Sequence, residues 1–144
     1  MGQIGQFLSH HWMLCGAFAL VIIAIFVMEA RTAGIGMGTA LSPQMVIQAI
    51  NRDQAVVIDI RDATLFRDGH IAGAINVPLS DWDVSEKKLQ KFKTKQVIIA
   101  DATGQKANTY LGKLVKQDFQ NVKTLSGGLT AWRNAKLPLK KGKE

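Results

Sequence analysis

Residues 98–108, IIADATGQKAN, have the pattern of a strand, a short turn and the start of a helix. The apolar run ends at Asp101, and Gly104 lies within the turn. Such a loop directs backbone N–H groups and a helix N-terminus at one small volume, which suits an anion. Enzymes often place a nucleophile at the first position of such a turn, where this chain has an aspartate instead of a thiol or hydroxyl.

Three roles are open to Asp101. Its carboxylate could N-cap the turn that follows, or it could fill the anion site from within and imitate a bound anion. It could also act as a nucleophile for phosphoryl or other transfer, but the sequence offers no accompanying Mg-binding carboxylate cluster or general base. The six residues that form this active-site-like loop are Asp101, Ala102, Thr103, Gly104, Gln105 and Lys106.

Other polar and glycine residues follow neighbouring apolar runs. Asp59 and Arg61 come at the end of one run, and Gly127 and Gly128 come after another. The carboxyl ends of parallel strands meet at one edge of a sheet, so we expect these residues and the Asp101 loop to share a rim. We expect Asp59 and Arg61 to hold loops together, His70 to bond the backbone, and the glycines to make a tight turn.

The elements that position this rim alternate between strand and helix patterns. Short β-branched apolar runs predict strands at 55–60, 73–78, 96–101 and 121–125. Helical spacing predicts helices at 43–52, 63–69, 84–93, 106–119 and 129–135, with Met45 and Val84 among the inward-facing residues. Strands buried on both faces and separated by helices indicate an α/β fold with a parallel sheet covered on each side.

The N-terminal part is apolar and carries no Lys, Arg, Asp or Glu before Glu29. Residues 12–28, extended back through 7–11, give about 22 residues, or roughly 33 Å of helix, which is enough to cross a bilayer. We therefore predict a transmembrane anchor at 1–29. A cleaved signal peptide would need a cationic n-region and a small-residue cleavage site, and a buried soluble helix would usually be shorter with a polar face.

The remaining organisation follows from glycine content and charge. Residues 30–41 are predicted to be a flexible Gly-rich tether, residues 42–137 the α/β domain, and residues 138–144 a solvated basic tail. Positive residues lie only on the C-terminal side of the anchor. This asymmetry predicts a single-pass topology with the N-terminus out and the domain in the cytoplasm.

The formal net charge of +7 favours an anionic partner. Because no nucleic-acid-binding motif accompanies the charge, a membrane surface with anionic lipid is the preferred partner and nucleic acid is not expected. The single cysteine, Cys15, excludes an intramolecular disulfide. The sequence predicts no cofactor and no metal site.

The soluble part resembles the rhodanese-like family through three stretches: residues 56–78, 97–107 and 122–132. The resemblance implies a five-stranded, mostly parallel sheet flanked by helices, and sulfur transfer through a cysteine persulfide. An N-terminal span before a single domain of this kind is similar to membrane-anchored bacterial members. It therefore implies the bacterial inner membrane as the location.

Catalytic members of that family open the loop after the fourth strand with Cys-x-x-Gly-x-Arg. On this chain the Cys position is Asp101, the Gly is Gly104 and the Arg position is Lys106. A carboxylate cannot hold sulfur as a persulfide. We therefore expect a catalytically inactive binding or regulatory module at the cytoplasmic membrane face, with a membrane-proximal protein as partner.

Two other functions stay open. One is an enzyme, either a sulfurtransferase with an atypical loop or an Asp-based transferase. The other is a lipid-surface protein that depends on its basic charge.

Overall fold

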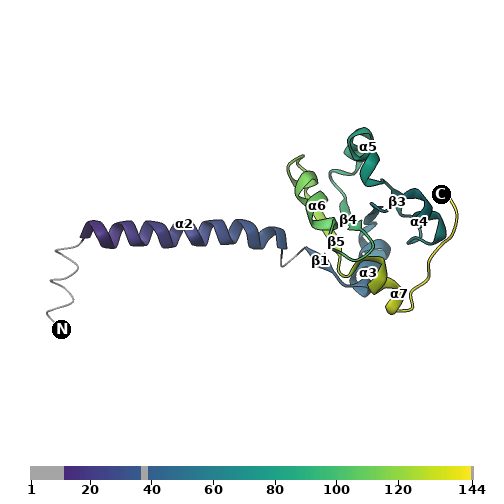
Figure 1. Cartoon of the computed structure of the whole chain (residues 1–144), viewed down its shortest axis with the longest axis horizontal. Helices are drawn as coiled ribbons and strands as arrows, with labels where there is room; N and C mark the ends of the chain where they lie inside the picture. Colours follow the sequence, from purple (N-terminus) through teal and green to yellow (C-terminus); the bar gives the residue numbers. More distant parts are fainter. Residues whose placement is uncertain (1–11, 37–38, 144) are drawn as a thin grey trace. The chain divides into compact units, whose positions relative to one another are not determined.

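The structure is a computed structural model that describes residues 12–36 and 39–143. The chain divides into two compact units, residues 1–34 and 35–144. The second unit holds the sheet and the helices around it (Figure 1). Both apolar clusters found among the described residues lie in this unit as well, so it has a core of its own.

The first unit consists, in its described part, of helix α2 (Trp12–Gly36). The large apolar side chains described between Met13 and Val27 are all exposed, by 43 to 73%. Across the described residues, no helix was found that is both long and apolar enough to cross a membrane. The anchor predicted at 1–29 includes residues 1–11, which lie outside the described residues.

The second unit contains one five-stranded sheet in which all neighbouring strands run parallel. The strand order is β1-β5-β4-β2-β3. Ile58 in the interior strand β2 lies opposite Ile99 of β4 on one side and Ile75 of β3 on the other. The strands are β1 (Ala40–Leu41), β2 (Val56–Asp59), β3 (Ile75–Asn76), β4 (Gln96–Ala100) and β5 (Asn121–Leu125).

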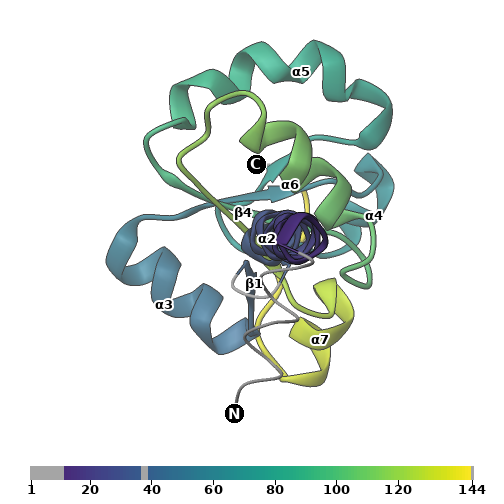
Figure 2. The ribbon, with the colours of Figure 1, turned by 90° about the vertical axis from the view of Figure 1, so that its left-hand side faces the viewer.

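Helices cover both faces of this sheet, which confirms the predicted α/β fold. Figure 2 shows α5 and α6 above β4 and α3 and α7 below it. Two short 3₁₀ helices, η1 (Leu79–Asp81) and η2 (Gln90–Phe92), flank α5. The α-helices are α3 (Pro43–Asp53), α4 (Ala63–Asp68), α5 (Trp82–Leu89), α6 (Ala107–Val115) and α7 (Gly128–Asn134).

Alternating side chains of the central strands fill two separate cores. Ile98 belongs to the cluster that contains Phe66, Leu129 and Trp132, whereas Ile99 belongs to the cluster that contains Leu111. Both isoleucines are fully buried. Because each such side chain contributes about 1.5–3 kcal/mol when buried, the sheet is stabilised from both faces.

In helices α3 and α5, the residues that face the core differ from the prediction. Met45 and Val84 were expected to face inward, but their side chains are 51% and 78% exposed. Val46 and Trp82 are buried in their place. Ser42 accepts a hydrogen bond from the Met45 N–H, which fixes where α3 begins and turns Val46 toward the sheet.

The predicted tether at 30–41 differs from the structure at both of its ends. Helix α2 extends to Gly36, and residues 37–38 lie outside the described part. Ala40 and Leu41 form the edge strand β1, with the Thr124 N–H donating to the Thr39 carbonyl at 2.7 Å. A two-residue strand is too short to show a periodicity, so it could not be predicted from the residue pattern.

The predicted solvated tail, residues 138–144, lies against the domain over its described length. The Trp132 indole N–H donates to the Pro138 carbonyl at 3.1 Å. Lys140 and His70 exchange backbone hydrogen bonds of 2.8 and 2.9 Å, and the Gly142 N–H donates to the Arg67 carbonyl. The charge of the segment carries no information on these backbone hydrogen bonds, so its packing against the domain was not predicted.

Two glycines offer a matched test of the backbone. A Cβ atom would meet nothing within 4 Å at either Gly112, inside α6, or Gly73. Gly112→Ala should raise the free energy of unfolding by about 0.5–1 kcal/mol because alanine is the better helix former. Gly73→Ala should lower it by about 1 kcal/mol because φ is +76° there. Urea unfolding of both variants measures the difference, and equal effects would contradict these assignments.

Candidate functional site

The candidate site lies where three neighbouring strands end. Strands β5, β4 and β2 are adjacent and parallel, so Leu125, Ala100 and Asp59 terminate them at the same edge. The loop of residues 101–106 leaves β4 here and leads into α6. A turn containing two glycines leaves β5 and leads into α7. The sequence prediction of a shared rim rested on this geometry of parallel sheets.

The Asp101 carboxylate lies inside its own loop. Its Oδ1 accepts the Gly104 N–H at 2.6 Å, and its Oδ2 accepts the Lys106 N–H at 2.8 Å. Asp101 is only 4% exposed. Both oxygens therefore act as acceptors, as they do in an ionised carboxylate, and two of the loop's amides are occupied by a side chain of the protein itself.

These hydrogen bonds bear on the roles considered for Asp101. The two donors, Gly104 and Lys106, both precede Ala107, the first residue of α6. An N-cap side chain bonds amides in the first helical turn, beyond the cap residue. The carboxylate here bonds amides three and five residues further on, inside the turn. The bond across three residues has the spacing of a cap on that turn, and the bond to Lys106 closes the rest of the loop.

The glycine turn holds the loop from its other side. The Leu129 N–H donates to the Asp101 carbonyl at 2.8 Å, and the Thr130 N–H and hydroxyl donate to the Ala102 carbonyl at 3.0 and 2.9 Å. Gly128 has φ +58°, and a Cβ there would lie 2.5 Å from the Asp101 carbonyl oxygen. Only glycine permits this close approach.

A pocket of about 160 Å³ adjoins the loop. Its polar wall includes Asp101, Gln105 and Lys106. Its apolar side chains come from Ile60, Leu65 and Leu79, which the sequence analysis did not single out. No cysteine or serine is among the described residues that line it, and Thr103 supplies its one hydroxyl.

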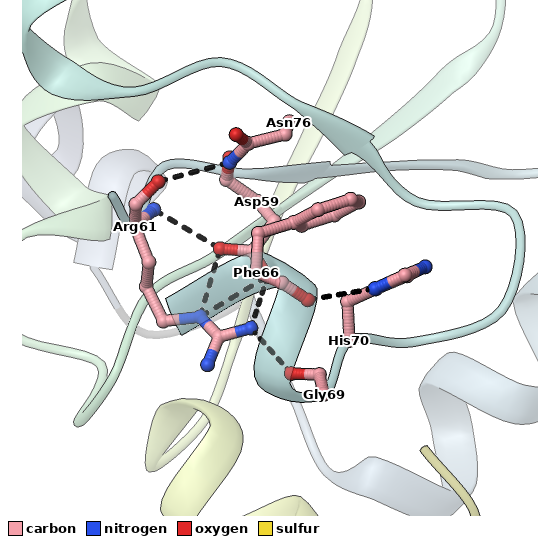
Figure 3. Close-up of polar contacts among 6 residues, drawn as sticks. All are labelled: Asp59, Arg61, Phe66, Gly69, His70 and Asn76. Carbon is pink, nitrogen blue, oxygen red and sulfur yellow. Dashed lines mark hydrogen bonds and ion pairs between the residues drawn. The ribbon is translucent and has the colours of Figure 1, made fainter. Parts of the chain in front are cut away.

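Asp59 and Arg61 form a buried ion pair beneath the rim (Figure 3). Arg61 Nη2 lies 2.6 Å from Asp59 Oδ2, and Arg61 Nε lies 2.9 Å from Oδ1. Nη2 also donates to the Gly69 carbonyl at 2.8 Å. The Asn76 side-chain amide donates to the carbonyls of Asp59 and Arg61 at 3.1 and 2.9 Å. This network joins the ends of β2 and β3 to the turn after α4.

Residues 42–135, which carry the loop, the glycine turn and the ion pair, match the family described as the Rhodanese-like domain. The chain belongs to the rhodanese-like family. It is 33% identical over 149 residues to the uncharacterized protein YibN of Escherichia coli (strain K12), covering 99% of this chain and 100% of that protein.

Two further similarities concern the rhodanese-like domain alone. The chain is 28% identical over 95 residues to the thiosulfate sulfurtransferase GlpE of Pseudoalteromonas translucida, covering 66% of this chain and 89% of that protein. A rhodanese-related crystal structure from Thermoplasma volcanium has a TM-score of 0.60 at 22% identity. The similarity covers 71% of this chain and 97% of the Thermoplasma chain. The Thermoplasma chain therefore consists almost entirely of this fold.

His70 lies away from the pocket of this rhodanese-like domain. It is fully buried, and its ring is stacked on Phe66 with centroids 3.8 Å apart. Nδ1 lies 2.8 Å from the Phe66 carbonyl (Figure 3). His70 is not among the residues that line the pocket beside Asp101. The structure therefore brings together Asp101, Arg61, Gly127 and Gly128 at the rim, and places His70 in the packing behind it.

One contact of the rim, made by the Thr130 hydroxyl, was not predicted from the sequence. Thr130 donates its hydroxyl to the loop, as described above. A hydroxyl two residues after a glycine pair carries no signal of its own. Lys106, which stands at the family's Arg position, contacts the Asp101 carboxylate through its backbone N–H.

The ion pair yields a stability prediction. Arg61→Leu should lower the free energy of unfolding by about 3–5 kcal/mol, because it leaves the Asp59 carboxylate buried without its partner. Arg133→Leu is the matched control, since Arg133 is exposed on α7, and should change it by less than about 0.5 kcal/mol. Equal losses in urea unfolding would show that the pair does not stabilise the rim.

Proposed function

We propose that the protein is a membrane-attached rhodanese-like domain that does not transfer sulfur and that acts as a binding or regulatory module. The observation that carries the proposal is the Asp101 carboxylate, which takes the loop's Gly104 and Lys106 amides for itself. The loop and the glycine turn keep the form of an anion site. The anion is a side chain of the protein.

Chemistry supports the absence of sulfur transfer. A persulfide forms when a thiolate attacks a sulfane sulfur, and a carboxylate at residue 101 cannot make that bond in a stable form. A carboxylate in the pocket also repels thiosulfate, which is itself an anion. Cys15 is the only cysteine of the sequence, and it belongs to α2, which this proposal places in the membrane, where low polarity disfavours a thiolate.

The rival function is sulfur transfer by an atypical loop, favoured by the similarity to the protein named thiosulfate sulfurtransferase GlpE. An Asp-based transferase is a weaker rival because both Asp101 oxygens already accept hydrogen bonds from the loop. These rivals differ from the proposal in one simple respect. Each requires turnover by the purified protein.

The anion-filled loop predicts a rescue experiment. Asp101→Ala should lower the free energy of unfolding by about 1.5–3 kcal/mol, because it leaves the Gly104 and Lys106 amides without their acceptor. Sulfate or thiosulfate should restore much of that loss in the variant and have little effect on the wild type, measured by urea unfolding at matched ionic strength with chloride as control.

Two results would contradict this account. Sulfate that stabilises both proteins equally would show that Asp101 does not occupy an anion site. Thiosulfate:cyanide sulfurtransferase activity of the wild type above a heat-killed control would establish the rival function. Asp101→Cys tests the loop further, since sulfur loading after thiosulfate treatment, read by mass spectrometry, would show that only the nucleophile has been lost.

A binding module needs an exposed surface, and the rim supplies one. Gln105 and Lys106 are exposed beside the pocket, as are Ala102 and Thr103. We propose that these loop residues face a membrane-proximal protein. Pull-down of the detergent-solubilised chain should lose partners when residues 102–106 are exchanged for an unrelated loop. Unchanged partner sets would exclude the loop as the interface.

The membrane part of the proposal rests on the apolar N-terminal sequence. The described apolar side chains of α2 are exposed around the helix, and residues 7–11 of the sequence extend the uncharged stretch. Such a surface is stabilised by lipid or by another apolar partner. We propose a single-pass arrangement in a bacterial inner membrane, with the N-terminus out and the domain in the cytoplasm.

Membrane attachment is tested by fractionation. The full chain should stay with membranes after alkaline carbonate extraction, whereas a chain lacking residues 1–34 should be released. A protease added to spheroplasts should leave the rhodanese-like domain intact, and a protease added to inverted vesicles should degrade it. Release of the full chain by carbonate, or the opposite protease pattern, would refute the anchor or its orientation.

A further inference from the structure

Lysines concentrate on one segment of the rhodanese-like domain. Five lie between residues 87 and 95, against two carboxylates, Asp83 and Glu86, in residues 82–95. The segment 82–95 comprises α5, η2 and the residues that follow. In Figures 1 and 2, α5 lies at an outer edge of the sheet-bearing unit. The five lysines are Lys87, Lys88, Lys91, Lys93 and Lys95.

Helical spacing places some of these lysines on a single face together with an apolar side chain. Val84, Lys87 and Lys88 lie at i, i+3 and i+4 on one face of α5, and Lys91 follows in η2, where it lines the same hollow as Lys88. All four are exposed. We call these four residues the lysine face.

Val84 distinguishes this face from an ordinary solvated helix surface. At 78% it is the most exposed large apolar side chain among the described residues of the chain. The opposite side of the same helix is well packed, with Trp82 and Leu89 no more than 2% exposed. The orientation of α5 is therefore fixed by its core contacts, and that orientation holds Val84 and the lysines outward.

A hollow lies beside the lysine face. It has a volume of about 200 Å³ and is lined by Lys88, Lys91 and Ser85, with Ile75 and Phe92 forming apolar walls. The Lys91 ammonium lies 4.9 Å from the centre of the Phe92 ring, so that lysine lies along the edge of this apolar surface. Two cations and a hydroxyl next to apolar walls suit a phosphate group joined to a hydrocarbon chain.

We propose that the lysine face and this hollow bind the headgroups of anionic phospholipids in the membrane to which the protein is attached. Lysines attract an anionic surface, and their aliphatic stems and Val84 can enter the region between headgroups and acyl chains. Nucleic acid fits less well, because two aromatic side chains of this region, Trp82 and Tyr110, pack against each other with centroids 4.4 Å apart, and the Lys91 ammonium lies over the ring of the third, Phe92. The inference builds on the proposed membrane attachment, but its test does not use the N-terminal segment.

The test uses residues 35–144, which contain the whole sheet and both cores and correspond to the Thermoplasma chain described above. The probe is cosedimentation with vesicles of phosphatidylglycerol and phosphatidylcholine. The wild type should bind these vesicles, should not bind pure phosphatidylcholine, and should bind less as salt rises. Replacing Lys87, Lys88 and Lys91 with Gln should weaken partitioning on the order of 100-fold.

The matched control replaces three exposed lysines elsewhere, Lys116, Lys136 and Lys141, with Gln. It removes the same charge and should stay within about threefold of the wild type, since these residues lie outside the lysine face. Val84→Ser should weaken binding to vesicles but not binding of a polyuridylate probe.

Three results would overturn the proposal. The first is an absence of wild-type binding to anionic vesicles, and the second is a control triple variant that loses as much affinity as the lysine-face variant. Polyuridylate binding that is tighter than vesicle binding and that depends on Lys87, Lys88 and Lys91 would make this face a nucleic-acid site. None of these results involves Asp101 or thiosulfate. The proposal that the loop is catalytically inactive is therefore tested independently of the lipid-binding proposal.

Discussion

The carboxylate of Asp101 organises the rim of this domain. Its two oxygens accept the Gly104 and Lys106 amides at 2.6 and 2.8 Å from a position almost closed to solvent. A short loop with inward-pointing amides would otherwise need an anion or water to satisfy them. Because the acceptor is covalently part of the loop, no ligand has to be recruited, and the loop forms together with the rest of the fold.

The loop in turn depends on the strands and on α7. Parallel strands β4 and β5 end side by side, so the residues after them come within hydrogen-bonding distance. The Leu129 and Thr130 amides bond the carbonyls of Asp101 and Ala102, and Gly128 lets the two backbones approach. The Asp59–Arg61 pair stabilises the adjoining turn. Loop, glycine turn and ion pair are thus three parts of one rigid edge.

Much of this architecture could be predicted from the sequence because its signals are local. The runs that became β2 and β4 are almost wholly apolar, β5 carries Val122 and Leu125 as its buried apolar residues, and Gly127 and Gly128 mark the turn after β5. The exceptions were set by tertiary contacts. β1 exists through its pairing with β5, the C-terminal segment is held by backbone bonds to His70 and Arg67, and Val84 is exposed because Trp82 takes the inward position.

The candidate site was predictable in its boundaries but not in its bonding. The positions of the loop residues 101–106 followed from strand and turn patterns, whereas the choice of Gly104 and Lys106 as donors depends on the direction of one side chain.

The direction of the Asp101 side chain has a consequence for regulation. A loop ordered by a metabolite changes with the supply of that metabolite, but a loop ordered by its own aspartate is constitutive. Under the proposed function, a partner that binds this surface therefore meets a loop whose order does not depend on a bound sulfur compound.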